Sequence, residues 1–149
     1  MSRTNWRIVL ALAVCAALLS TTASAKDQVT RSILHLQGNV TLVVDLSDWS
    51  FEAEDWGNAS HGGRFTNQGW GYMLPGGYLV GEGILTAANG DQLFWTMRGP
   101  TCTFTGGTGR FEGATGGFIF VFGPPEITFE DGLMIVKFSY MGAEGTITY

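Results

Sequence analysis

The chain has 149 residues, of which 45% are hydrophobic and 14% are charged, and its formal net charge is −5. This length is typical of one domain with one hydrophobic core. The acidic balance argues against nucleic acids and anionic membranes as partners, because both bind basic surfaces.

Residues 1–25 have the pattern of a secretory signal peptide. Two arginines precede an apolar run over 8–19, and small residues follow up to Ala25. The run is shorter than the roughly 18 residues that a membrane-spanning helix needs, so we expect no membrane anchor. We expect an N-terminal signal helix, cleavage after Ala25, and a secreted or periplasmic single domain over 26–149. That domain has 6 basic and 13 acidic residues, a net charge of −7.

The two cysteines lead to different expectations. Cys15 raises the alternative of lipoprotein processing, but that processing needs a small residue where Val14 stands. After cleavage Cys102 is the one cysteine left, so the mature chain can form no internal disulfide. We expect Cys102 to be buried as a small hydrophobic side chain.

The pattern after the leader predicts an almost all-β domain, because β-branched and aromatic residues fall in short runs between glycine, proline and asparagine. A long acidic loop with two tryptophans is expected over 47–61, as a lid or a mouth. Eight or so strands suit a small barrel or a sandwich. The predicted strands lie at about 31–37, 40–46, 62–72, 77–87, 91–98, 100–105, 117–123, 133–141 and 143–149.

The clearest local signal is a hairpin, because Asn89 is followed by a glycine and both residues tolerate positive φ. A two-residue loop there would pair Glu82 with Met97. Tyr78 and Glu82 would then share a face with Trp95, which places Glu82 alone in an otherwise apolar row.

A string over 105–117 contains six glycines and then runs into an aromatic strand. It does not fit a dinucleotide or phosphate loop, because Glu112 stands where a glycine is needed and no helix follows. We interpret it as a special turn that Arg110 and Glu112 fix by pairing with neighbours or backbone, with a ligand contact as the alternative.

The strands over 118–122 and 133–141 are apolar on both faces or nearly so. Barrel packing on one face and a subunit contact on the other would explain this, so we expect a homo-oligomer, a dimer or a trimer. The alternative is a sandwich core with an apolar surface patch.

Four strings resemble the allene oxide cyclase-like and dirigent-like barrel group, in its uncharacterised secreted bacterial branch: 59–65, 85–94, 106–116 and 145–149. The resemblance implies a single eight-stranded antiparallel β-barrel of calycin-like shape, with an apolar cavity and an oligomeric assembly. One departure is Gly62, where close relatives have leucine. No catalytic residue is carried over from the group, since fold does not fix function.

Two carboxylates are candidate catalytic residues. Glu82, desolvated against Trp95, would have a raised pKa and could act as a general acid or base. The alternatives are that Glu82 pairs with Arg98 or Lys137, or that a register shift of one residue turns it to water. Asp45 is a second candidate of the same kind.

The candidate ligand-binding residues are Arg64, His61, Trp95, Arg98 and Tyr78. His61 can exchange a proton and Arg64 can hold a carboxylate or an oxyanion, although both could instead cap a turn. The two histidines have no cysteine or acidic residue at ligand spacing, so neither a metal nor another cofactor is expected.

We predict that the barrel binds a small, largely apolar molecule in its cavity. One alternative is a cofactor-free cyclase or isomerase that acts in the same cavity. Another is an extracellular carbohydrate-binding module using Trp49, Trp56, Trp70 and Tyr72. A ligand-sized apolar cavity would support the first two, whereas a filled interior with exposed tryptophans would support the third.

Overall fold

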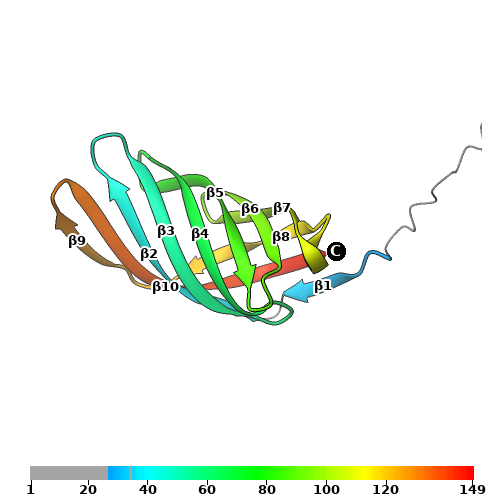
Figure 1. Ribbon diagram of the computed structural model, residues 1–149. Coiled ribbons are helices and arrows are strands. Elements are labelled where there is room, and N and C mark those ends of the chain that lie inside the picture. The colour runs from blue at the N-terminus through cyan, green and yellow to red at the C-terminus, as the bar shows by residue number, and fades with distance from the viewer. Residues whose placement is uncertain (1–26, 34) are drawn as a thin grey trace, which may run out of the picture.

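The computed structural model describes residues 27–33 and 35–149, so the predicted signal peptide lies outside the described residues. The described chain forms a closed eight-stranded antiparallel β-barrel (Figure 1), which confirms the predicted fold class. It contains no helix that is long and apolar enough to cross a membrane. The elements are β1 (Thr30–Ile33), β2 (Leu36–Asp45), β3 (Ser50–Ala59), β4 (Gly63–Leu74), β5 (Tyr78–Ala87), β6 (Gln92–Arg98), β7 (Thr101–Gly107), the 3₁₀-helix η1 (Gly109–Phe111), β8 (Thr115–Phe122), β9 (Glu126–Glu130) and β10 (Leu133–Thr148).

Two of the barrel strands are interrupted, so ten segments make eight strands. β1 and β2 follow one another along one edge of β10. β8 and β9 follow one another along its other edge and are separated at 123–125. Pro124 and Pro125 lie in this gap and provide no backbone N–H for a ladder. The strand order β10-β2-β3-β4-β5-β6-β7-β8 closes where β8 pairs with β10.

The core fills the inside of the barrel, because alternate side chains of every strand point inward. In β2, buried Leu42 and Val44 alternate with partly exposed Thr41 and Val43. Cys102 is buried in this core, as predicted. Other strands contribute Phe51, Phe65, Ala87, Leu93, Trp95, Met97, Phe104, Phe118, Val136 and Tyr140.

The predicted acidic loop over 47–61 is wrong, because most of that segment is strand β3. Its inward positions include Ala53 and Asp55, which lack the β-branched character by which a strand is recognised. β9 was not predicted either, and the two strands expected near the C-terminus are the single strand β10.

The predicted hairpin joins β5 and β6, but its register differs by one residue from the prediction. Gly90 has a φ of 89°, and the loop is one residue longer than a two-residue turn. Glu82 therefore pairs with Thr96, and Gly83 pairs with Trp95. Because a shift of one residue exchanges the faces of a strand, Glu82 lies on the outside and does not share a face with Trp95.

The glycine-rich string over 105–117 forms the end of β7, η1 and the start of β8. Gly109 has a φ of 57° and leaves no room for a Cβ, which would collide with the Asp91 carboxylate. Arg110 donates from Nη2 to the Gly62 carbonyl at 3.1 Å, and its Nε lies 3.6 Å from Oδ2 of Asp91. The predicted pairing of Arg110 with backbone and with a neighbouring side chain is confirmed. That Arg110 and Glu112 fix the turn stays a prediction.

Candidate functional site in the barrel interior

The two ends of the barrel differ. At one end Phe111 of η1 is buried in the core. At the other end the hairpin of β9 and β10 projects (Figure 1) and carries exposed Ile127 and Phe129, the latter 69% exposed. Exposed Phe122 is the last residue of β8, which precedes this hairpin. Ile127 pairs with buried Val136 and so shares its inward face. We call this apolar end, lined by Phe122, Ile127 and Phe129, the mouth.

One carboxylate lies inside the apolar barrel. Asp55 on β3 is 9% exposed and is the one charged residue in the buried set of the described chain. It points inward because it shares a face of β3 with Phe51 and Ala53. A buried carboxylate is costly unless it is hydrogen-bonded, so its partners define the candidate site.

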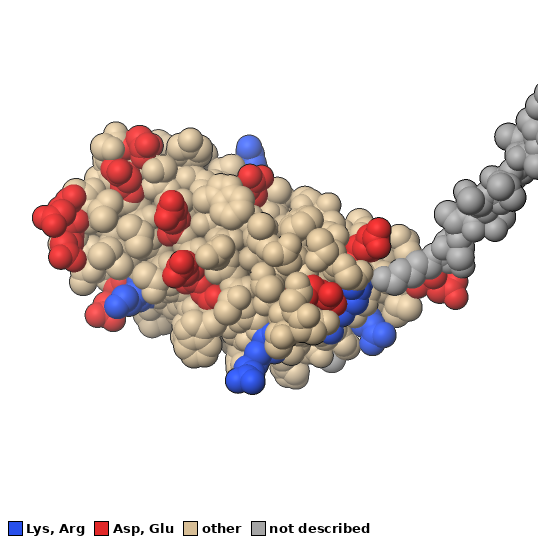
Figure 2. Space-filling view, viewed as in Figure 1, with Lys and Arg blue, Asp and Glu red and all other residues tan. Residues whose placement is uncertain are grey.

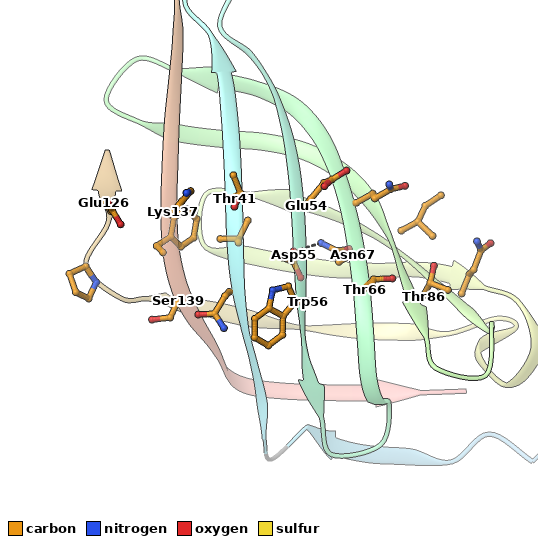
Figure 3. Close-up of a pocket in the computed structure, with 17 residues that line it drawn as sticks. Thr41, Glu54, Asp55, Trp56, Thr66, Asn67, Thr86, Glu126, Lys137 and Ser139 are labelled. Carbon is orange, nitrogen blue, oxygen red and sulfur yellow. Dashed lines mark hydrogen bonds between the residues drawn. The ribbon is translucent and has the colours of Figure 1, made fainter. Parts of the chain in front are cut away.

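Three side chains from three other strands form a hydrogen-bond network with Asp55. Asn67 on β4 donates from Nδ2 to Oδ2 of Asp55 at 2.5 Å (Figure 3). Tyr140 on β10 donates its hydroxyl to Oδ1 of Asp55 at 2.9 Å. Trp95 on β6 donates from Nε1 to Oδ1 of Asn67 at 2.6 Å. We call these four residues the interior network, which links four strands through the core.

A glycine on the intervening strand lets Tyr140 reach Asp55. β2 lies between β10 and β3, and its Gly38 pairs with Tyr140. A Cβ at Gly38 would lie 2.7 Å from the Tyr140 ring. The absence of a side chain there leaves room for the ring and its hydroxyl.

The burial of Asp55 changes its acid–base behaviour. Desolvation raises the pKa of Asp55 from 3.8 to about 6, and the hydrogen bonds from Asn67 and Tyr140 oppose this rise. Burial, and then the nearby Asp55 charge, raise the pKa of the Cys102 thiol and of the Tyr140 hydroxyl. Asp55 is therefore an interior acid that can exchange a proton near neutral pH.

Small cavities lie inside the described part of the barrel, and two of them border predicted or observed site residues. The first, of about 40 Å³, is lined by the interior network and by Phe122 and Phe138, and so extends toward the mouth. The second, also of about 40 Å³, lies next to His61 and Phe111. Each holds a few water molecules at most, whereas ligand pockets measure roughly 300 Å³ or more. The described interior is nearly filled, so the expected ligand-sized apolar cavity is not found there. Of the two signs named for the alternatives, the structure shows a filled interior with exposed tryptophans.

Two predicted ligand-binding residues lie against these cavities. Trp95 is buried and belongs to the interior network. His61 is half-buried in the turn between β3 and β4 and borders the second cavity. The ligand-binding roles of Trp95 and His61 stay predictions. Within the described chain, no group of three His, Cys, Asp or Glu side chains is arranged to hold a metal ion.

The other predicted ligand-binding residues lie on the outer face, together with Glu82. Arg64, Arg98 and Tyr78 are exposed on β4, β6 and β5. Glu82 is also exposed, and its Oε1 accepts a hydrogen bond from Nε1 of Trp70 at 3.1 Å. The hairpin register explains the misplacement of Glu82 and Tyr78, since both lie on β5 at positions that face outward.

Asp45 lies at the end of β2, where it caps the turn into β3. Its Oδ1 accepts a hydrogen bond from the Ser47 N–H at 2.8 Å. Hydrogen bonds from Ser47 lower the pKa of Asp45. A carboxylate that stays ionised in this way does not favour the predicted role in proton transfer.

Sequence reasoning missed Asp55, Asn67 and Tyr140. The alternation of Val136 and Tyr140 with polar residues in β10 was a usable signal that Tyr140 points inward. No comparable signal existed for Asp55, because its inward direction depends on β3 being a strand.

Comparison with solved structures identifies the fold. The chain superposes on a pterocarpan synthase dirigent protein with a TM-score of 0.51 and 16% sequence identity, over 82% of this chain and 92% of that one. No protein-family model and no curated protein sequence matches the chain. The allene oxide cyclase relationship and the secreted bacterial branch stay predictions. The described chain has the fold of a dirigent-like β-barrel.

Proposed function

We propose that the barrel interior binds one small, largely apolar molecule that carries a hydrogen-bonding group. The observation that supports this most is Asp55, a carboxylate kept inside an apolar core with two hydrogen-bond partners, Asn67 and Tyr140. A core built for stability alone is as well or better served by apolar residues at such a position. The fold supports this function, because a solved structure with a similar fold is named a pterocarpan synthase dirigent protein.

The proposed ligand enters through the mouth and widens the first cavity. That cavity has about 40 Å³, so Phe122 and Phe138 must move to admit a ligand. The mouth is suited to such movement, because among described residues β9 pairs with β10 alone and is separated from β8 by two prolines. The exposed apolar side chains there also favour an apolar ligand.

Proton transfer inside the barrel is a second candidate function. The pKa of Asp55 of about 6 suits a group that accepts and returns a proton near neutral pH. With Tyr140 beside it, Asp55 could assist a cofactor-free cyclisation or isomerisation of a bound substrate. In this proposal Asp55 takes the role that sequence reasoning gave to Glu82 and Asp45.

The binding proposal is tested with N-phenyl-1-naphthylamine, an apolar fluorophore whose emission rises in dry sites. Ala53 lines the first cavity, so Ala53→Leu should fill it and weaken probe binding at least tenfold. Glu52→Leu places the same side chain on the outer face of the same strand and is the matched control. Equal probe affinity in the two variants would contradict an interior site.

Native mass spectrometry of the protein from its own host tests for the natural ligand. A retained small molecule that is lost in Ala53→Leu and kept in Glu52→Leu is the expected result. For the proton-transfer candidate, Asp55→Asn should leave the retained molecule bound but abolish its conversion. Loss of binding and conversion together would argue against a role in proton transfer.

A further inference from the structure

We infer that the outer face of the barrel carries a second binding site, a groove for a neutral polysaccharide centred on Trp56. The groove has a volume of about 1030 Å³ and crosses β10, β2, β3, β4, β5 and the start of β6 (Figure 3). It is more than twenty times as large as either interior cavity. Its outward side chains lie on the opposite face of the sheet from the interior network, although two members of that network, Asp55 and Asn67, also contribute to its lining.

The strand register aligns one row of outward side chains across the groove. Each member of the row is the pairing partner of the next, so the row runs straight across six strands. Neighbouring strands lie about 4.8 Å apart, which gives the row a length of roughly 24 Å along the sheet. The row consists of Ser139, Asn39, Trp56, Thr66, Thr86 and Gln92.

The chemistry of this row suits a sugar chain. Trp56 is 62% exposed and offers a flat apolar indole face, an unusual feature at the centre of a polar surface. Sugar rings have an apolar C–H face that stacks on such a ring and hydroxyl groups around their edge. The hydroxyl and amide side chains on both sides of Trp56 can donate and accept hydrogen bonds, as sugar hydroxyls require.

The charges favour a neutral ligand over an anionic one. The five side chains that flank Trp56 in the row are all uncharged. In the adjoining row Lys137 pairs across strands with Glu126, and Glu54 adds a further negative charge. Figure 2 shows acidic side chains spread over the viewed face with uncharged surface between them. An acidic polysaccharide or a nucleic acid would be repelled here.

The outer groove and the interior site can be tested separately. Asp55 and Trp56 are consecutive residues of β3, and one is buried while the other is exposed. A substitution of Trp56 should therefore leave the binding of N-phenyl-1-naphthylamine unchanged. The groove does not depend on the proposed interior function, and either proposal can fail alone.

The test is native affinity electrophoresis through gels that contain hydroxyethyl cellulose, laminarin or galactomannan, with alginate as the anionic comparison. At least one neutral polysaccharide should slow the protein, and alginate should not. Trp56→Ala should weaken the retardation at least tenfold, whereas Trp56→Phe should keep part of it. Trp49→Ala removes another exposed tryptophan, 49% exposed, from the turn between β2 and β3 and should migrate as the unmodified chain does.

Three results would overturn the inference. The first is no retardation by any of the three neutral polysaccharides. The second is equal retardation of Trp56→Ala and Trp49→Ala. The third is a change of oligomeric state in Trp56→Ala, measured by light scattering after size exclusion, since Trp56 would then be a contact between copies of this chain.

Discussion

The Tyr140 hydroxyl lies 2.9 Å from Oδ1 of Asp55, although 85 residues separate the two along the chain. Neither residue is on a strand next to the other, because β2 lies between β10 and β3. The pairing of β10 and β3 with the two edges of β2, together with the missing side chain at Gly38, brings them together. The stability of the barrel should therefore report on the ionisation of Asp55.

Asp55 should make the barrel more stable at acidic than at neutral pH. Its folded pKa of about 6 exceeds the ordinary value of 3.8, so the folded chain binds more protons than the unfolded chain between these values. The stabilisation that the protonated Asp55 gives to the folded chain is fully present below pH 3.8 and is lost as the pH rises through 6. The loss should reach about 3 kcal/mol of unfolding free energy.

Urea denaturation between pH 4 and pH 7.5 measures this dependence. Other carboxylates also titrate in this range, so the informative quantity is the difference between the unmodified chain and Asp55→Asn. That difference should change with pH, whereas Glu52→Gln, an exposed carboxylate on the same strand, should give a curve parallel to that of the unmodified chain. Parallel curves for Asp55→Asn as well would show that Asp55 ionises normally.

Tyr140→Phe should raise the pKa of Asp55 further. The lost hydroxyl donates to the ionised carboxylate, and this bond lowers the pKa of Asp55. Its removal should cost about 1–3 kcal/mol at pH 7.5 and move the upper end of the pH transition to higher values. The same denaturation series checks this, with the exposed Tyr72→Phe as control. A stability loss that is equal at every pH would mean that the hydroxyl acts without affecting Asp55.

Gly83→Ala should destabilise the barrel because of the place of Trp95. The new methyl group would collide with the Gln68 carbonyl oxygen and the Trp95 ring, so Trp95 would have to shift away from Asn67. Overpacking of this kind costs roughly 1–3 kcal/mol. Urea denaturation followed by tryptophan emission measures both effects. Gly62→Ala is the control, since its methyl group would lie 3.3 Å from the Ala59 Cβ, the one atom of the described chain within contact distance beyond its chain neighbours. Similar losses of unfolding free energy in both variants would contradict the packing argument.

Much of the barrel could be predicted from local patterns. Alternation along β2 and along the first half of β10 marks which side chains point inward, and Gly90 marks the position of a hairpin. The pairing of Arg110 could be predicted because it lies in a glycine-rich string that is not followed by a helix and therefore forms a turn. These features depend on neighbours within a few residues, which a single sequence displays.

The interior network could not be predicted in the same way. The hairpin loop has one residue more than predicted, so β5 pairs with β6 in a different register and Glu82 lies on the outer face. Asp55 lies in a strand whose inward residues are small or acidic, so local propensity favoured a loop. The partners of Asp55 come from β4 and β10, and only the three-dimensional register brings those strands to it.

Arg110 should hold together the end of the barrel that lies opposite the mouth. Its side chain is 37% exposed, yet it bonds the Gly62 carbonyl, lies beside Asp91 and covers the Phe111 ring at 4.7 Å. Arg110→Ala should therefore cost about 1–2 kcal/mol of unfolding free energy in urea. Arg110→Lys should recover less than half of this loss, because an ammonium group cannot reproduce the planar fork of donors.

Arg98→Ala is the control, because it removes an exposed arginine of β6. Its unfolding free energy should stay within about 0.5 kcal/mol of that of the unmodified chain. If Arg110→Ala were as mild as Arg98→Ala, the glycine-rich turn would be fixed by its backbone alone.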